Sequence, residues 1–159
     1  MFGFSILAAA VMAALSVQQT PAAGLVADPP PMGRPCIQDD LVGVWKSDLL
    51  AQGGRTAPTP LSTDYMRFGA DGAMAYFAAP RAPATIEEVD HGLDLVAEAG
   101  PRFSASILGD GVLVIARDGT PVEGFTCTVL KNEGDEGELV LSQLKGRPPV
   151  YRHNRRLHR

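Results

Sequence analysis

The chain has 159 residues and a mass of 16.8 kDa, enough for one domain with a hydrophobic core. Hydrophobic residues make up 45% and charged residues 20%, a composition typical of a globular protein. The net charge of −4 gives no reason to expect nucleic acid or an anionic membrane surface as a partner.

The N-terminal segment has the features of a secretory signal peptide. Residues 4–17 form an uncharged apolar run, shorter than the roughly 20 residues that span a bilayer, and small residues follow it. We therefore expect a signal peptide over residues 1–23, with cleavage between about Ala22 and Ala27. The mature protein is then periplasmic or secreted, with no integral membrane span. A buried helix is the competing interpretation.

Residues 24–35 form a Pro-rich stretch without a hydrophobic period. Proline fixes the backbone in extended conformations and removes hydrogen-bond donors, so such a stretch builds little regular structure. We therefore expect an N-terminal arm here, and a folded domain that starts at Cys36.

The chain has two cysteines, Cys36 and Cys127. In an oxidising compartment, two cysteines and no third most simply form one disulfide bond. Two buried thiols are the alternative. The histidines do not stand at metal-ligand spacing from the cysteines, so we expect no metal site and no cofactor.

Beyond Cys36 the sequence has the rhythm of short strands separated by turn residues. Three Asp-Gly pairs, which suit tight hairpin turns, stand between expected strands. A helical turn that Asp39 or Asp40 caps is expected just before the first strand. The C-terminal end, residues 151–159, carries four arginines, and such a basic end is expected to be solvated, with contact to the envelope or to nucleic acid as the alternative. The eight expected strands cover residues 41–47, 65–68, 73–77, 103–107, 112–116, 122–131, 138–144 and 150–155.

One segment has the helical period instead. Apolar residues recur at spacings of three and four between residues 86 and 96. Thr85 followed by Glu88 matches a capping box, and Gly100 with the next proline is a stop signal. We therefore expect one short helix near residues 85–98.

Eight antiparallel strands in an open sheet would leave two unpaired edges. Closure into a barrel removes both edges and leaves an interior just wide enough for side chains or one small ligand. The expected fold is therefore mainly all-β: an eight-stranded antiparallel up-and-down barrel over residues 36–156, with one short helix. An open sandwich is the competing architecture.

The first expected strand contains the sequence "LVGVWK", with Gly43 and Trp45. This G-x-W motif resembles the signature of lipocalins, which are calycin-type barrels, and of smaller bacterial lipocalin-like domains. The hairpin at residues 68–72, the further Asp-Gly turns and a last strand that contains Arg152 resemble the same family. The resemblance covers about residues 38–156.

The resemblance implies how one end of the barrel is closed. In that family the tryptophan plugs the closed end, and an arginine near the last strand packs across it. Trp45 is then the plug, Gly43 belongs to the same motif, and Arg152 is the expected partner, with Arg155 as the second choice. Such a cation–π contact contributes roughly 0.5–2 kcal/mol. A core tryptophan in an unrelated β-fold is the alternative.

The expected strands alternate small side chains with large apolar ones. This pattern favours an apolar pocket with Trp45 at its floor, although a filled interior is the alternative. The candidate ligand-pocket residues are Trp45, Met66, Phe68 and Phe103.

The sequence shows no motif that assembles a nucleophile, a base and an orienting acid, and no glycine loop that would bind phosphate. We therefore expect a binding protein rather than an enzyme. The resemblance implies a carrier or sensor of a small hydrophobic ligand. The alternatives are a protein-binding module, such as a periplasmic protease inhibitor that uses its N-terminal arm, and a structural envelope protein.

Overall fold

The computed structural model describes residues 32–52, 55–58, 64–131, 136–145 and 149–159. The expected signal peptide and the first part of the expected arm, up to residue 31, lie outside the described residues. The helices are α1 (Gln38–Leu41), α2 (Ile86–Ala99) and the short 3-10 helix η1 (Gly109–Gly111). The strands are β1 (Arg34–Pro35), β2 (Gly43–Gln52), β3 (Arg55–Pro58), β4 (Asp64–Phe68), β5 (Ala73–Ala78), β6 (Phe103–Leu108), β7 (Val112–Arg117), β8 (Thr120–Lys131), β9 (Glu138–Gln143) and β10 (Tyr151–His158).

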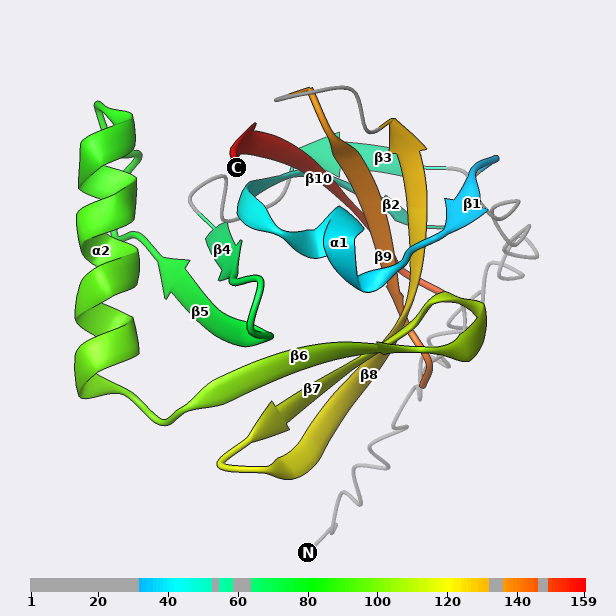
Figure 1. Ribbon diagram of the computed structural model, residues 1–159. Coiled ribbons are helices and arrows are strands. Elements are labelled where there is room, and N and C mark those ends of the chain that lie inside the picture. The colour runs from blue at the N-terminus through cyan, green and yellow to red at the C-terminus, as the bar shows by residue number, and fades with distance from the viewer. Residues whose placement is uncertain (1–31, 53–54, 59–63, 132–135, 146–148) are drawn as a thin grey trace, which may run out of the picture.

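Eight of these strands form a closed antiparallel barrel, as the sequence predicts, and not a sandwich (Figure 1). The order around the barrel is β2-β4-β5-β6-β7-β8-β9-β10, and β10 returns to pair with β2. Each strand pairs with the next barrel strand along the chain, which is the up-and-down arrangement. The short strands β1 and β3 add to the outside of this ring, on β8 and β2.

The hairpin turns follow the chemistry of the Asp-Gly pairs. Asp110 and Asp118 adopt positive φ values of 60° and 48°, and the glycine after each does so too. Two successive residues with positive φ match the twist of an antiparallel hairpin, and Asp and Gly are among the residues that tolerate this conformation. These local signals therefore fix the turns that lead into β7 and β8.

Side chains of the barrel strands alternate between an inner and an outer core. The inner core lies inside the barrel and includes Trp45, Met66 and Leu113. The outer core lies on the outside of β4 and β5, where Tyr65 packs near Leu93 of α2. Because successive side chains of a strand point to opposite faces, β4 contributes to both cores.

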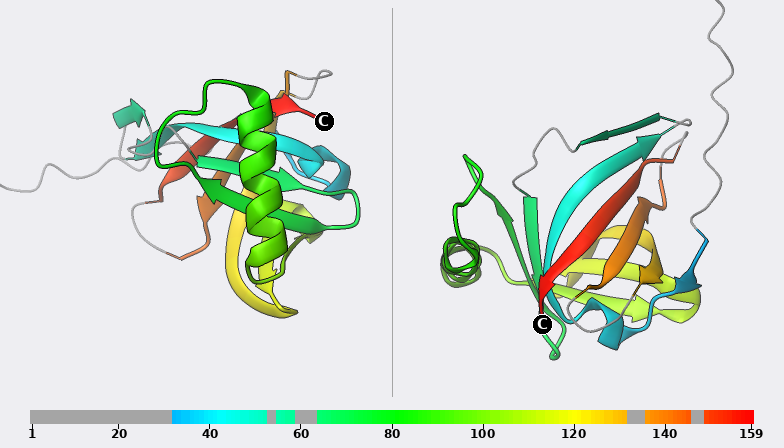
Figure 2. Two further views of the ribbon diagram at one scale, coloured as in Figure 1. Left: turned by 90° about the vertical axis from the view of Figure 1, so that its left-hand side faces the viewer. Right: turned by 90° about the horizontal axis from the view of Figure 1, so that it is seen from above.

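Helix α2 covers the outer face of β4 and β5, as Figure 2 shows. The predicted cap is present, since the Thr85 hydroxyl accepts a hydrogen bond from the Glu88 N–H, and the helix ends at Gly100. Gly92 does not break the helix. A Cβ atom at Gly92 would lie 2.3 Å from the ring of Phe77, so its glycine lets α2 approach β5 closely.

The shortest contact between neighbouring barrel strands is the one between β5 and β6. Only Ala73–Ser104 and Met74–Phe103 are paired there, because α2 and its connections separate the two strands in the sequence. On β6, the Gln38 side chain takes the place of a neighbouring strand: it donates to the Ala105 C=O and accepts from the Ile107 N–H.

The C-terminal segment corrects one expectation. Residues up to His158 form β10, which pairs with both β2 and β9 in the barrel wall, so the basic segment is not a solvated tail. Two of its polar side chains have partners outside the barrel: Arg155 pairs with Asp48 at 3.0 Å, and the His158 ring lies 3.0 Å from Asp90 on α2. In the described part of the chain, no helix is long and apolar enough to cross a membrane.

Candidate binding site in the barrel

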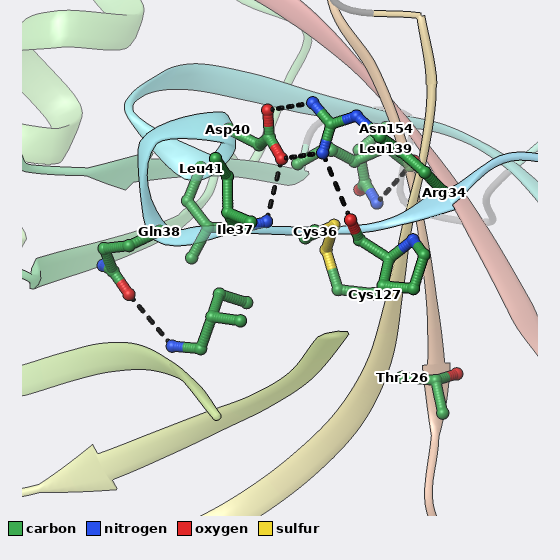
Figure 3. The surroundings of a disulfide bond; sticks show 12 residues. Arg34, Cys36, Ile37, Gln38, Asp40, Leu41, Thr126, Cys127, Leu139 and Asn154 are labelled. Atoms are coloured by element: carbon green, nitrogen blue, oxygen red, sulfur yellow. Dashed lines mark hydrogen bonds and ion pairs between the residues drawn. A yellow bond between two sulfur atoms is a disulfide. The ribbon is translucent and has the colours of Figure 1, made fainter. Parts of the chain in front are cut away.

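One end of the barrel is closed by the segment between β1 and β2. The Cys36–Cys127 disulfide that the sequence predicts joins this segment to β8, with the two Cα atoms 5.5 Å apart (Figure 3). The arm contributes more than expected here, because Arg34 and Pro35 pair with β8 as strand β1. The disulfide and the β1–β8 pairing therefore hold the segment before α1 against β8, so that α1 lies across the end of the barrel.

Asp40 holds this segment together, as Figure 3 shows. Its side chain is 2% exposed, accepts two hydrogen bonds from Arg34 at 2.6 and 2.7 Å, and accepts a third from the Ile37 N–H at 2.8 Å. A buried carboxylate with several donors keeps its charge at low cost. The carboxylate contacts raise the pKa of Arg34, so the guanidinium remains charged beside Asp40.

Trp45 plugs the barrel immediately inside α1. It is fully buried, and its indole N–H donates to the Leu41 C=O at 2.6 Å. The guanidinium of Arg156 lies over the ring, 4.5 Å from the centroid, and donates to the Asp40 C=O at 2.8 Å. At Gly43 a Cβ atom would lie 2.6 Å from the His158 C=O, so the glycine of the G-x-W motif lets the last strand approach.

The prediction that Arg152, or failing that Arg155, packs over Trp45 is therefore wrong. Arg156 is the residue that pairs with Trp45 across β10 and β2, whereas Arg152 lies opposite Leu50, nearer the other end of the barrel. Arg155 points outward and pairs with Asp48. The β10–β2 pair also contains a register shift between His153 and Asn154, and the sequence gives no sign of it.

Above the plug the barrel contains a cavity of about 360 Å³. It opens at the end opposite α1, where Tyr76 and Val122 are 42% and 55% exposed. Three of the four predicted pocket residues line it, namely Met66, Phe68 and Phe103. Trp45 does not, although it belongs to the same buried cluster. The lining residues are Ser47, Met66, Phe68, Met74, Tyr76, Phe103, Leu113, Ile115, Val122, Glu123, Phe125, Leu141, Gln143 and Arg152.

The polar groups of the cavity gather toward its opening. On one side, Gln143 donates to Glu123 at 2.6 Å. Deeper inside, the Ser47 hydroxyl donates to Asn154 at 2.7 Å. The Arg152 guanidinium lines the cavity too, and within the part of the chain that the structure describes it makes no hydrogen bond or ion pair. The apolar floor and the polar opening together suit an amphipathic ligand.

Tyr76 lies between two charged side chains at the opening. Burial, followed by its hydrogen bond to Asp64 and by the charge of that carboxylate, raises the pKa of Tyr76 above 10.0, while the charge of Arg152 acts in the opposite direction. Asp64 is 5% exposed, and its Oδ1 atom has no hydrogen-bond partner among the described residues.

The sequence analysis missed Asp64, Tyr76 and Arg156. Strand alternation could have identified Asp64. Asp64, Met66 and Phe68 stand at every second position of β4, so their side chains point to the same, inward face. The register with β4, which places Tyr76 opposite Met66, could not be read from the sequence. Within the described residues, no group of three metal-ligating side chains could hold a metal ion.

Comparison of the chain with protein-family models, with curated proteins and with solved structures finds no match of any of the three kinds. A proposal for the function therefore rests on the geometry of the barrel.

Proposed function

We propose that this chain is an exported binding protein of the lipocalin-like type, and that its barrel carries a small, largely apolar ligand. The observation that carries this proposal is the cavity of about 360 Å³, which has an apolar floor and a polar opening. Ligand pockets in proteins typically have volumes of about 300–1,000 Å³ and combine an apolar lining with a few polar groups. This cavity lies at the lower end, which favours a short chain or a single ring.

The two ends of the barrel support a carrier. Eight-stranded barrels are just wide enough for one small ligand, and a ligand held inside needs one end closed and one end open. Trp45 and α1 close one end, while Tyr76 and Val122 border the opening. The G-x-W motif at the closed end supports the lipocalin-like assignment.

The chemistry of the lining supports binding rather than catalysis. No histidine or cysteine is among the described residues that line the cavity, and the hydroxyl of Ser47 donates to an amide oxygen of Asn154. Nucleophilic catalysis by serine requires a base within hydrogen-bond reach. Export is part of the proposal, because disulfides such as Cys36–Cys127 persist chiefly in oxidising compartments.

The test is calorimetric titration of the mature protein with short-chain fatty acids, alcohols, amides and amines and with single-ring aromatic compounds. We expect at least one class to bind with one site per chain. Met74→Trp, which adds bulk inside the cavity, should abolish that binding. Ala73→Trp, at an exposed position at the start of the same strand and outside the cavity lining, is the matched control and should retain it. A silent panel, or equal binding by both variants, would contradict the proposal.

A protein-binding role of the closed end is the second candidate. Ile37 and Leu108 are 58% and 56% exposed, and both line a shallow hollow at the base of the arm, beside Pro35. Such apolar side chains suit contact with another protein. Deletion of residues 24–31 separates the two candidates while leaving Arg34 and β1 in place. A carrier should keep its ligand affinity, whereas an arm-dependent protease inhibitor should lose its inhibition.

A further inference from the structure

We infer that the ligand carries a head group that both donates and accepts hydrogen bonds and has no net charge, such as a primary amide or a zwitterion. This inference rests on the proposed function and names the class of ligand for the same cavity. The geometry points to it through two charged side chains near the opening, Asp64 and Arg152, because the described residues leave the Asp64 Oδ1 atom and the Arg152 guanidinium without a hydrogen-bond partner.

Asp64 supplies the acceptor. It is the first residue of β4 and, by strand alternation, shares the inward face of Met66 and Phe68. It does not itself line the cavity, but it is hydrogen-bonded to Tyr76, which does. The carboxylate is 5% exposed, and its Oδ1 atom has no partner among the described residues. A buried polar atom without a partner loses its hydration and gains nothing in return, so it can accept a hydrogen bond from a ligand at a gain in free energy. A ligand N–H or O–H would satisfy it.

Arg152 supplies the donor. Its guanidinium lines the cavity from β10 and is close enough to Tyr76 for its charge to act on the phenol. Among the described residues it makes no hydrogen bond or ion pair, although Arg155 and Arg156 of the same strand both have partners. Tyr76 connects the two charged groups, because its hydroxyl donates to Asp64 and can still accept from a ligand.

The charges at the opening decide against a simply charged head group. A carboxylate ligand would pair with Arg152 but would approach Glu123, which lines the cavity, and Asp64, which lies behind Tyr76. An amine ligand would pair with Asp64 but would meet Arg152. Like charges brought together in a partly desolvated site repel and weaken binding. A head group with a donor on one side and an acceptor on the other avoids both repulsions.

The size of the cavity limits the apolar body. Long-chain lipids need more room than about 360 Å³, whereas a single ring or a short chain fits. Head-group preference can therefore be measured on two short bodies, phenylpropyl and hexyl. For each body the probes are the amide (hydrocinnamamide and hexanamide), the carboxylate (hydrocinnamate and hexanoate) and the amine (phenylpropylamine and hexylamine).

The experiment is calorimetric titration of the mature protein with these six probes at neutral pH. On at least one body, we expect the amide to bind about tenfold more tightly than the carboxylate and the amine, because each charged probe leaves one protein group unpaired or repelled. Equal affinities, or a carboxylate that binds most tightly, would overturn the head-group inference but leave the carrier proposal intact. If none of the probes binds, both the head-group inference and the carrier proposal are contradicted.

Two variants assign the preference to its residues. Asp64→Asn should remove the discrimination against the carboxylate, so that hydrocinnamate or hexanoate gains about tenfold. Arg152→Gln should weaken the amide and the carboxylate and improve the amine. Asp94→Asn and Arg155→Gln are the matched controls, because these residues lie on the outside of the molecule in exposed ion pairs. If the controls change head-group preference as much as Asp64→Asn and Arg152→Gln do, the assignment is wrong.

Discussion

The two ends of this barrel treat buried charge in opposite ways. At the closed end, Asp40 accepts three hydrogen bonds, and Arg156 lies over Trp45 while donating to the Asp40 C=O. At the open end, Asp64 is almost equally buried, yet one of its oxygens has no partner among the described residues. Arg152 likewise lines the cavity with its donors unused by the described residues.

This difference separates a structural role from a binding role. Burial of a polar group costs free energy that its own hydrogen bonds must offset, and for the Asp40 carboxylate at the closed end they do. At the open end the Oδ1 atom of Asp64 lacks such a hydrogen bond among the described residues, so the fold tolerates an unfavourable local free energy there. Residues that break the rule of satisfied burial are the ones expected to serve function. The contrast can be tested by equal changes at the two ends.

The largest effect is expected at the disulfide. The Cys36–Cys127 bond closes a loop with a sequence separation of 91 residues. The loop-closure entropy for that length is worth about 4–5 kcal/mol. Replacing both cysteines with serine should therefore lower the thermal midpoint by roughly 10 °C or more, as measured by calorimetry.

The replacement of both cysteines should lower the stability of the whole domain but should not change the structure of the open end. Well below the midpoint, the double serine variant should keep its strand content by circular dichroism and its affinity for whichever probe binds the cavity. Two free thiols in the unreduced, unfolded protein would contradict the role given to the bond, and thiol counting on exported material measures this directly.

A smaller effect compares the same substitution at both ends. Asp40→Ala leaves the Ile37 N–H without its acceptor and should cost at least about 1 kcal/mol for that bond alone. Asp64→Ala removes one oxygen without a partner among the described residues and one that accepts from Tyr76, whose half-exposed hydroxyl can turn to water, so it should cost less than Asp40→Ala. Urea denaturation of the two variants measures both values. A larger loss at Asp64 than at Asp40 would refute the contrast.

The smallest effect concerns alkaline pH. Burial first, and then the charge of Asp48, raise the pKa of Tyr65 above 10.0, against the opposing charge of Arg155. Because the folded-state pKa is raised, the associated stability is fully present below pH 10.0 and declines as the pH rises above it. The urea midpoint should therefore be lower at about pH 11 than at about pH 9.

Two tyrosine variants sharpen that measurement. Tyr65 is 5% exposed beneath α2, whereas Tyr76 is 42% exposed at the opening. Tyr65→Phe should thus remove more of the alkaline decline than Tyr76→Phe does. The two tyrosinates can also be followed by their ultraviolet absorbance in the folded protein, and a Tyr65 that ionises together with free tyrosine would count against its raised pKa.

The sequence by itself determined the local elements and the overall closure. Alternation and the Asp-Gly pairs give the eight barrel strands, Thr85 and Gly100 give the ends of α2, and Cys36 and Cys127 give the disulfide. These features depend on neighbouring residues, on turn chemistry or on the count of cysteines. Closure follows from them, because eight such strands in an open sheet would expose two edges.

Only the tertiary structure decided which side chains meet. Alternation along the last strand can separate Arg155 from Arg152 and Arg156, but only the pairing of β10 with β2 places Arg156 on Trp45 and Arg152 at the cavity. That pairing contains register shifts, and a shift of one residue moves a side chain to the other face of the sheet. Register across strands distant in the sequence is set by the packing of the whole barrel, and local sequence does not encode it.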